Sequence, residues 1–273
     1  HNNMREYRLP LELTAMVISH LDFPGADLPK YSVVSRDWQA IFERRTFSTI
    51  NLGSSRRLAR LSRIVGQDPR RQSYVRELNL LVELEPYDVV ARANFETAAE
   101  HNRNNDIFVT AIESLFRILA SWPELEPGVC LSIRAESPSD VCSLERVKEA
   151  ATHPEKDLLS RRFERSYLRI GDEHLRQLPI VRAVTQLDIP MAHPRLLWPA
   201  SSAIISSKLT RLQSVEIRLC DNDQRDRALR KQNRTGKLCG SVIGPLVNLL
   251  SRFCPPFHAL AFVSQGVLPG ILE

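Results

Sequence analysis

The sequence has few cysteines and glycines, and it has no long apolar stretch free of proline. None of its five cysteines forms a Cys-x-x-Cys pair, so the ligand spacing of a structural zinc site is missing. We therefore expect reduced thiols in a cytoplasmic or nuclear protein. The longest uncharged run, residues 253–272, contains three prolines, and the N-terminus lacks the apolar core of a signal peptide. The sequence predicts a soluble protein with no membrane partner.

Sequence motifs typical of enzymes are also missing. There is no glycine-rich phosphate loop, no Gly-x-Ser-x-Gly elbow and no His-Glu-x-x-His pair. Glu83 and Glu85 would share one face of a strand, as a carboxylate pair would, but a solvated strand edge is the favoured interpretation. We expect no enzymatic activity, no cofactor and no metal, although a triad assembled from distant residues stays open.

The composition is that of a folded protein with a small excess of arginine. Of its 273 residues, 43% are hydrophobic and 25% are charged, and the formal net charge is +5. This length holds one sizeable domain and one small domain. The net charge permits an acidic partner without requiring one.

The first fifty residues contain two apolar faces at helical spacing, separated by prolines and a glycine. The first face consists of Leu13, Met16, Val17, His20 and Leu21. The second face consists of Val33, Val34, Trp38, Ile41 and Phe42. A segment this small buries little surface alone, so part of it should be available to a partner. The alternative is a helical hairpin folded onto the rest of the protein.

The same segment resembles an F-box of the kind found in a large group of fungal F-box proteins. Leu9-Pro10-x-Glu12-Leu13 is followed by Ile18, Leu21 and Leu28, and then by Val34-Ser35-Arg36-x-Trp38. The resemblance implies a three-helix module over residues 5–50 that docks on the Skp-family adaptor of a cullin–RING ubiquitin ligase. The residues it assigns to adaptor binding are Leu9, Pro10, Leu13, Ile18, Leu21, Val34 and Trp38.

Residues 51–70 are expected to form a basic helical linker. Ser54 or Ser55 would cap a short helix with Leu58, Leu61 and Val65 on its apolar face. The densest basic cluster of the chain starts on the other face of this helix: Arg56, Arg57, Arg60, Arg63, Arg70, Arg71 and Arg76. A solvated face is favoured, because no aromatic residues interleave for base stacking. A nucleic-acid surface is the alternative, and we do not expect a nucleic-acid partner.

From residue 71 to residue 273 we expect an α/β fold with a parallel sheet, arranged as an irregular leucine-rich-repeat-like solenoid. Leu212, Val215 and Ile217, followed by Cys220, fit the template L-x-x-L-x-L-x-x-N/C. Further matches or fragments are Val184/Leu187/Ile189, Val75/Leu78/Leu80, Leu131/Ile133, Leu168/Ile170 and Leu260/Phe262. Helices are predicted at 106–122, 198–207 and 223–237, and such alternation favours parallel strands joined by crossovers.

The predicted strands start at irregular intervals, near residues 75, 129, 166, 184, 214 and 258. The largest insertion, 137–165, is expected to be a mobile loop, and 238–273 is atypical, either irregular or truncated. A non-repeat α/β domain therefore stays open. Fungal F-box proteins of this type often resemble leucine-rich-repeat receptors in their C-terminal part.

The function we expect is substrate recognition in a Skp–cullin–F-box ubiquitin ligase. Side chains between the apolar strand positions would face outward and contact an unknown protein client: Glu77, Asn79, Ser132, Arg134, Tyr167, Arg169, Asp188, Glu216 and Arg218. The arginines would hold acidic or phosphorylated segments, or serve as solvent-exposed spacers. The alternatives are an adaptor-bound scaffold outside the ligase and a nucleic-acid-associated protein.

Overall fold

The centre of the molecule is a five-stranded parallel sheet. The computed structural model describes residues 35–140, 162–163, 166–190 and 196–217, together with Pro10, Leu13 and Met16. The strands of the sheet lie side by side in chain order: β1 (Thr49–Leu52), β2 (Glu77–Glu83), β3 (Val129–Glu136), β5 (Val184–Ile189) and β7 (Ser214–Ile217). A separate parallel pair consists of β4 (Tyr167–Leu168) and β6 (Leu196–Leu197). The predicted α/β class with a parallel sheet is confirmed.

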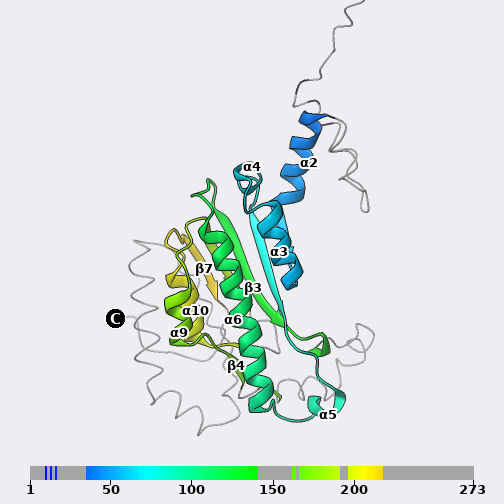
Figure 1. Cartoon of the computed structure of the whole chain (residues 1–273), viewed down its shortest axis with the longest axis vertical. Helices are drawn as coiled ribbons and strands as arrows, with labels where there is room; N and C mark the ends of the chain where they lie inside the picture. Colours follow the sequence, from blue (N-terminus) through cyan, green and yellow to red (C-terminus); the bar gives the residue numbers. More distant parts are fainter. Residues whose placement is uncertain are drawn as a thin grey trace, which may run out of the picture.

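Helices precede or connect the strands of the sheet. They are α2 (Arg36–Ser48), α3 (Ser55–Ile64), α4 (Pro69–Gln72), α5 (Val89–Arg92), α6 (Ala98–Ala120), α9 (Asp172–Gln177) and α10 (Pro199–Ser207), with a 3-10 turn η2 (Pro138–Asp140). Figure 1 shows α3, α6 and α10 on the same side of the sheet. We call this side the covered face and the opposite side the open face.

The apolar template residues of neighbouring strands lie in register. One row across the covered face consists of Ile50, Leu78, Leu131, Leu187 and Val215. Because side chains alternate along a strand, the residues two positions further on also point to the covered face. These include Leu52 and Leu80, which pair with each other and are at most 2% exposed.

Strand β1 was not predicted, although Phe47-x-x-Ile50-x-Leu52 follows the same template. It pairs with β2, and α3 follows it directly. Residues 51–70 therefore belong to the sheet module, and this differs from the predicted linker.

The helices start where side chains satisfy their free amide groups. Ser54 caps α3 by accepting a hydrogen bond from the amide of Arg57, as predicted. Helix α6 begins eight residues before the predicted position, because Thr97 and Glu100 form a capping box. Its predicted apolar face is confirmed, with Phe108 and Ile112 buried. The predicted helix at 223–237, the strand near 258 and the segment 238–273 lie outside the described residues.

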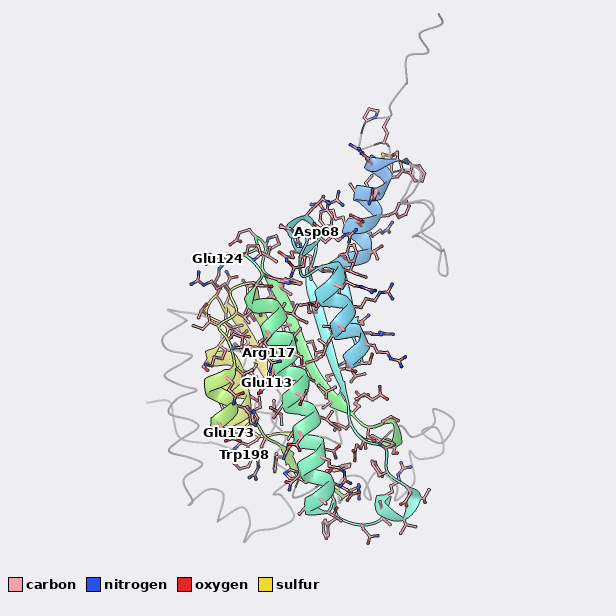
Figure 2. The ribbon with its side chains drawn as sticks, in the orientation of Figure 1. Asp68, Glu113, Arg117, Glu124, Glu173 and Trp198 are labelled. Carbon is pink, nitrogen blue, oxygen red and sulfur yellow. The ribbon has the colours of Figure 1, made fainter. Side chains whose placement is uncertain are left out.

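The covered face and its helices share one apolar core, and Figure 2 shows their side chains packed together. Two described parts of the predicted mobile insertion, 137–165, are anchored rather than exposed. Ser137, Arg162 and Phe163 are all at most 2% exposed. Most of that insertion lies outside the described residues.

Candidate functional site

The predicted adaptor-binding surface is described at Pro10, Leu13 and Trp38. Leu13 is 46% exposed, and Met16, one helical turn away, is 59% exposed. Both residues are helical, so their spacing places them on the same face. The other predicted adaptor-binding residues lie outside the described residues: Leu9, Ile18, Leu21 and Val34.

Trp38 lies in the first turn of α2. Ser35 caps this helix by accepting a hydrogen bond from the amide of Trp38 (3.2 Å). Trp38 is half-buried, and its ring lies 5.9 Å from that of Phe42. Phe42 is only 1% exposed, yet it is not part of the main apolar core. Phe47, near the end of α2, does pack against that core, so α2 contacts the sheet module through its C-terminal end.

A buried carboxylate ties α2 to the sheet module. Glu43 accepts hydrogen bonds from Arg70 (2.6 Å) and Arg71 (2.9 Å), and its side chain is only 11% exposed. Asp68 caps α4 and positions both arginines, because its carboxylate accepts their backbone amides. The three residues Glu43, Arg70 and Arg71 are called the Glu43 clamp below.

The Glu43 clamp also divides the predicted basic cluster. Arg70 and Arg71 share the carboxylate of Glu43, and Arg71 also pairs with Asp68 (3.3 Å). Arg76 donates to the backbone carbonyls of Ser73 and Val75. The arginines of α3 point outward, and Arg56, Arg60 and Arg63 form no ion pair with the residues that the structure describes. The cluster is not one continuous basic surface.

The open face of the sheet carries most of the predicted client-binding residues. One row across all five strands consists of Asn51, Asn79, Ser132, Asp188 and Glu216. Glu77 lies in the adjacent row, and Arg134 lies two residues beyond Ser132. The sheet thus brings together most of the residues that sequence reasoning selected, and Arg218 lies outside the described residues.

Hydrogen bonds order the β1 side of the open face. Asn79 donates to the side-chain carbonyl of Asn51 (3.1 Å). Thr49 donates to the carboxylate of Glu77 (3.2 Å) in the neighbouring row. These cross-strand contacts hold the side chains in place without covering them, since Thr49, Asn51 and Glu77 are exposed.

The open face is acidic. The strand positions that point to it carry five carboxylates among the described residues, Glu77, Glu83, Glu136, Asp188 and Glu216, and the single arginine Arg134. Cys130 lies within this surface opposite Glu77. Burial raises the pKa of the Cys130 thiol, and the negative charges of Asp188 and Glu77 raise it further.

The structure corrects the placement of Tyr167 and Arg169. Their segment pairs with β6 and lies beside α6, where the backbone amide of Arg169 donates to Asn105 (2.9 Å). The guanidinium of Arg169 lies 4.4 Å from the ring centre of Trp198, which Tyr167 contacts edge-on. The Leu168/Ile170 fragment of the repeat template thus lies at a separate strand pair, and the side chains of Tyr167 and Arg169 do not extend the open face.

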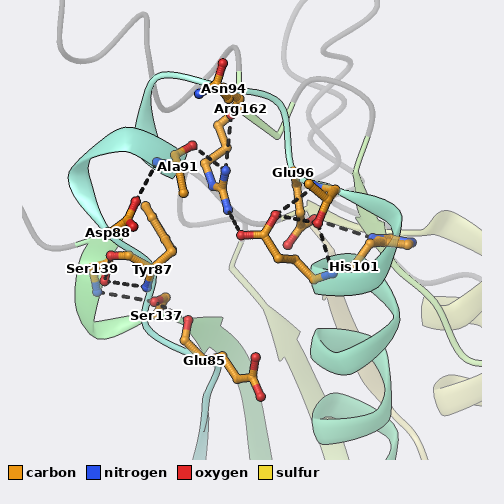
Figure 3. Close-up of polar contacts among 12 residues, drawn as sticks. Glu85, Tyr87, Asp88, Ala91, Asn94, Glu96, His101, Ser137, Ser139 and Arg162 are labelled. Atoms are coloured by element: carbon orange, nitrogen blue, oxygen red, sulfur yellow. Dashed lines mark hydrogen bonds and ion pairs between the residues drawn. The ribbon is translucent and has the colours of Figure 1, made fainter.

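A polar network missed by sequence reasoning lies at the carboxyl end of β2 (Figure 3). Arg162, whose side chain is 1% exposed, donates to the carbonyl oxygens of Ala91 and Asn94 and to the carboxylate of Glu100. Its guanidinium also lies 4.4 Å from the ring centre of Tyr87. The capping box at Thr97 and Glu100 was readable in the sequence, but the approach of Arg162 was not.

Arg162 helps to keep Glu100 ionised. Burial alone would raise the pKa of Glu100. Hydrogen bonds from the backbone and hydroxyl of Thr97 and from Arg162, together with the charge of Arg162, lower it below the ordinary glutamate value. This carboxylate therefore acts as a charged structural anchor.

A serine, a histidine and a glutamate also meet in this region. Ser166 donates to Glu96 and contacts Nδ1 of His101 (2.9 Å), while Asn105 contacts Nε2 (3.0 Å). With the proton on Nδ1, His101 donates to Ser166 and accepts from Asn105. The hydroxyl is then both donor and acceptor within the network, so the arrangement ties α6 to the segment before β4 rather than activating a nucleophile.

Glu83 and Glu85, the possible carboxylate pair for which a solvated strand edge was the favoured interpretation, are not held together as an acid–base site. Glu83 is exposed at the end of β2, and Glu85 forms an ion pair with Arg103 (2.7 Å). Within the described part of the chain, no group of three or more His, Cys, Asp or Glu side chains has the geometry to hold a metal ion. No helix among the same residues is both long and apolar enough to cross a bilayer.

One cavity lined by described residues is a groove of about 540 Å³ between α3, the end of β2 and α6, lined by Leu58, Leu81 and Ala111 among others. Another, of about 240 Å³, lies beyond the carboxyl end of β2 and is lined by Tyr87, Glu100 and Arg162 among others.

Comparison with family models, with curated proteins and with solved structures gave no match. The F-box resemblance therefore rests on the motif residues of this chain alone.

Proposed function

We propose that this protein is the substrate-recognition subunit of a Skp–cullin–F-box ubiquitin ligase. Its N-terminal segment binds the Skp-family adaptor, and the open face of its sheet binds a protein client. The exposure of Leu13 and Met16 carries the proposal: 46% and 59% of these apolar side chains lie open at helical spacing within the F-box-like motif. Contiguous exposed apolar residues are typical of a surface that another protein covers.

We further propose that the sheet module is an irregular leucine-rich-repeat-like solenoid. The strands are parallel and lie in chain order, and the connecting helices share one face. The apolar template residues stay in register from β1 to β7. These features are typical of a chain that adds one strand and one crossover at a time.

The Glu43 clamp supports the same proposal. A ligase receptor must hold its client at a defined position relative to the adaptor. Arg70 and Arg71 form ion pairs with Glu43 at 2.6 and 2.9 Å. These contacts fix α2, which carries Trp38, to the sheet module. A two-arginine contact to one carboxylate restricts rotation more than a single ion pair does.

The test is adaptor binding by purified protein. Leu9→Ala with Pro10→Ala, and separately Leu13→Asp with Met16→Asp, should each weaken binding to a Skp-family adaptor at least tenfold, about 1.4 kcal/mol. The matched control is Val89→Ala with Val90→Ala, because these valines are 83% and 73% exposed outside the motif. Unchanged adaptor binding by folded variants of both motif pairs would reject the proposal.

A second measurement separates a ligase subunit from a scaffold. Adaptor-bound protein should co-purify with a cullin when the three components are mixed. If the adaptor binds but excludes the cullin, the protein is an adaptor-bound scaffold and the ligase part of the proposal is wrong.

A further inference from the structure

We infer that an extended segment of a partner protein binds to the free edge of β2 as an added strand. The segment carries a lysine or arginine between two apolar residues. This site is separate from the residues that we assign to the adaptor and to the client, so the inference goes beyond the proposed function. Failure of either proposal leaves the other unaffected.

Strand β2 is longer than its neighbour β1. Strand β1 ends where Leu52 pairs with Leu80, and the chain then turns into α3. The next residues of β2 are Leu81, Val82 and Glu83, and they pair with β3 on one side. No described strand pairs with them on the other side. The last three residues of β2 therefore form a free sheet edge.

The backbone groups of Glu83 point to this free edge. The amide of Leu84 donates to the carbonyl oxygen of Glu136 in β3 (2.9 Å). Successive residues of a strand direct their backbone groups to opposite sides, so the amide and the carbonyl of Glu83 point away from β3. Neither group forms a hydrogen bond with a turn, a loop or a helix of the described chain. Unpaired backbone groups of this kind are the template on which another strand adds.

The sequence does not protect this edge. Edge strands that remain in solvent are commonly blunted by lysine, proline or a β-bulge. The free part of β2 has two apolar residues and one carboxylate, and its register with β3 contains no bulge. In β1, by contrast, the backbone carbonyl of Asn51 accepts a hydrogen bond from the side chain of Arg57 (3.3 Å). The helix after β1 therefore covers part of the β1 backbone, whereas a groove lies beside the free end of β2.

The free edge forms one wall of the groove of about 540 Å³ between α3 and α6. Residues 80–85 line this groove, so side chains from both faces of β2 border the same space. The other walls include the apolar residues Leu58 of α3 and Ile107 and Ala111 of α6. Figure 1 shows that α3 runs alongside only part of α6, and the N-terminal end of α3 borders the groove. An added strand would place alternate side chains in this apolar space.

The charged side chains that line the groove are all acidic: Glu83, Glu85 and Asp106. Glu85 forms an ion pair with Arg103 (2.7 Å). Glu83 and Asp106 are exposed, and neither forms an ion pair with the residues that the structure describes. The groove thus presents two uncompensated carboxylates and favours a cationic partner.

Strand geometry fixes the position of the cation. A residue directly opposite Glu83 on an added strand points to the same face, with its Cβ about 5 Å from that of Glu83. The neighbours of this residue lie opposite Val82 and Leu84, which point to the covered face and are 3% and 2% exposed. The expected pattern of the added segment is therefore apolar, basic, apolar.

The experiment measures peptide binding to the full chain by fluorescence anisotropy. The probe is a labelled peptide in which Val-Lys-Val is flanked by glycine and serine. Two counterparts carry Val-Glu-Val or Ser-Lys-Ser in the same frame, and each should bind at least tenfold more weakly than the probe. Equal binding by either counterpart, or no binding by the probe, would overturn the inference.

A charge exchange locates the site. Glu83→Lys should weaken binding of the Val-Lys-Val probe at least tenfold, and it should strengthen binding of the Val-Glu-Val counterpart. The matched control is Glu77→Lys, because Glu77 lies on the same strand and face about 20 Å away, where β1 covers the edge. This control should change binding of either peptide less than twofold. Equal effects of the two variants would mean general charge attraction and would reject the inference.

A backbone modification separates strand addition from side-chain contact alone. Alternate amides of the probe are methylated in two versions, and only one of the two sets faces β2 in an added strand. One version should therefore lose binding at least tenfold, and the other should change less than threefold. Equal losses in both versions, or no loss in either, would reject strand addition.

Discussion

The two faces of the five-stranded sheet differ by a shift of one residue along each strand. Leu78, Leu131 and Leu187 lie in one row on the covered face and are at most 2% exposed. Their neighbours Glu77, Cys130 and Gln186 form a row on the open face. Because a one-residue slip would exchange the two sets, the buried leucines fix the register. The residues between them can therefore be polar, although Ser132 is only 9% exposed and Asn79 and Cys130 are half-buried.

The largest expected effect comes from breaking the covered face. Leu131 is 0% exposed at the centre of the apolar row, so Leu131→Ala should lower the free energy of unfolding by about 2–5 kcal/mol. Ser132→Ala, one residue further along the same strand, should change it by about 0.5 kcal/mol or less, because the hydroxyl has no partner among the described residues. Urea unfolding of both variants measures the difference. Similar costs at the two positions would contradict the two-face description.

A smaller loss of stability is expected at the polar network beyond the carboxyl end of β2, which lies on neither face of the sheet. Arg162→Met removes the donors to the carbonyl oxygens of Ala91 and Asn94 and to the carboxylate of Glu100, all in a nearly buried site. The free energy of unfolding should fall by about 1–3 kcal/mol. Arg103→Met, which breaks the exposed ion pair with Glu85, is the control and should have a much smaller effect.

The pH dependence of this stability loss should show that Glu100 is the main partner of Arg162. Its pKa is below the ordinary value in the folded protein, so its stabilising contribution is complete above the ordinary glutamate pKa. This contribution is lost as the pH falls through the lowered folded pKa. The difference between wild type and Arg162→Met should therefore be largest near neutral pH and narrow in acid. A difference that is independent of pH would assign the effect of Arg162 to the two carbonyl contacts alone.

The repeat template predicted four of the five strands of the sheet, β2, β3, β5 and β7. It missed β1, although the three template positions of β1, Phe47, Ile50 and Leu52, are all apolar. In β3 the first template position is Gly128, because a Cβ atom there would lie 2.1 Å from Cγ2 of Thr185. A local repeat pattern does not reveal a close approach to a residue 57 positions away.

The same limit applies to the candidate site. Strand alternation correctly placed Glu77, Asn79, Ser132 and Asp188 on one face, because it is a local rule. The position of Arg169 depends on which strand its segment pairs with. Strand pairing is decided by contacts between residues that are far apart in the sequence, so the local rule could not predict it. The acidic character of the open face could be recognised only after that assignment.

The smallest expected effect is a change in the reactivity of Cys130, which lies on the open face. Glu77→Gln removes one of the two carboxylates that raise the pKa of Cys130, so more of the thiol is ionised at a given pH. Alkylation of Cys130 by iodoacetamide at mildly alkaline pH, followed by mass spectrometry, should be faster by roughly twofold. Glu83→Gln is the control, because Glu83 lies on the same strand and face but about 20 Å further along it. An equal rate increase in both variants would mean that the open face acts on Cys130 only through its total charge, and not through the carboxylate of Glu77 opposite it.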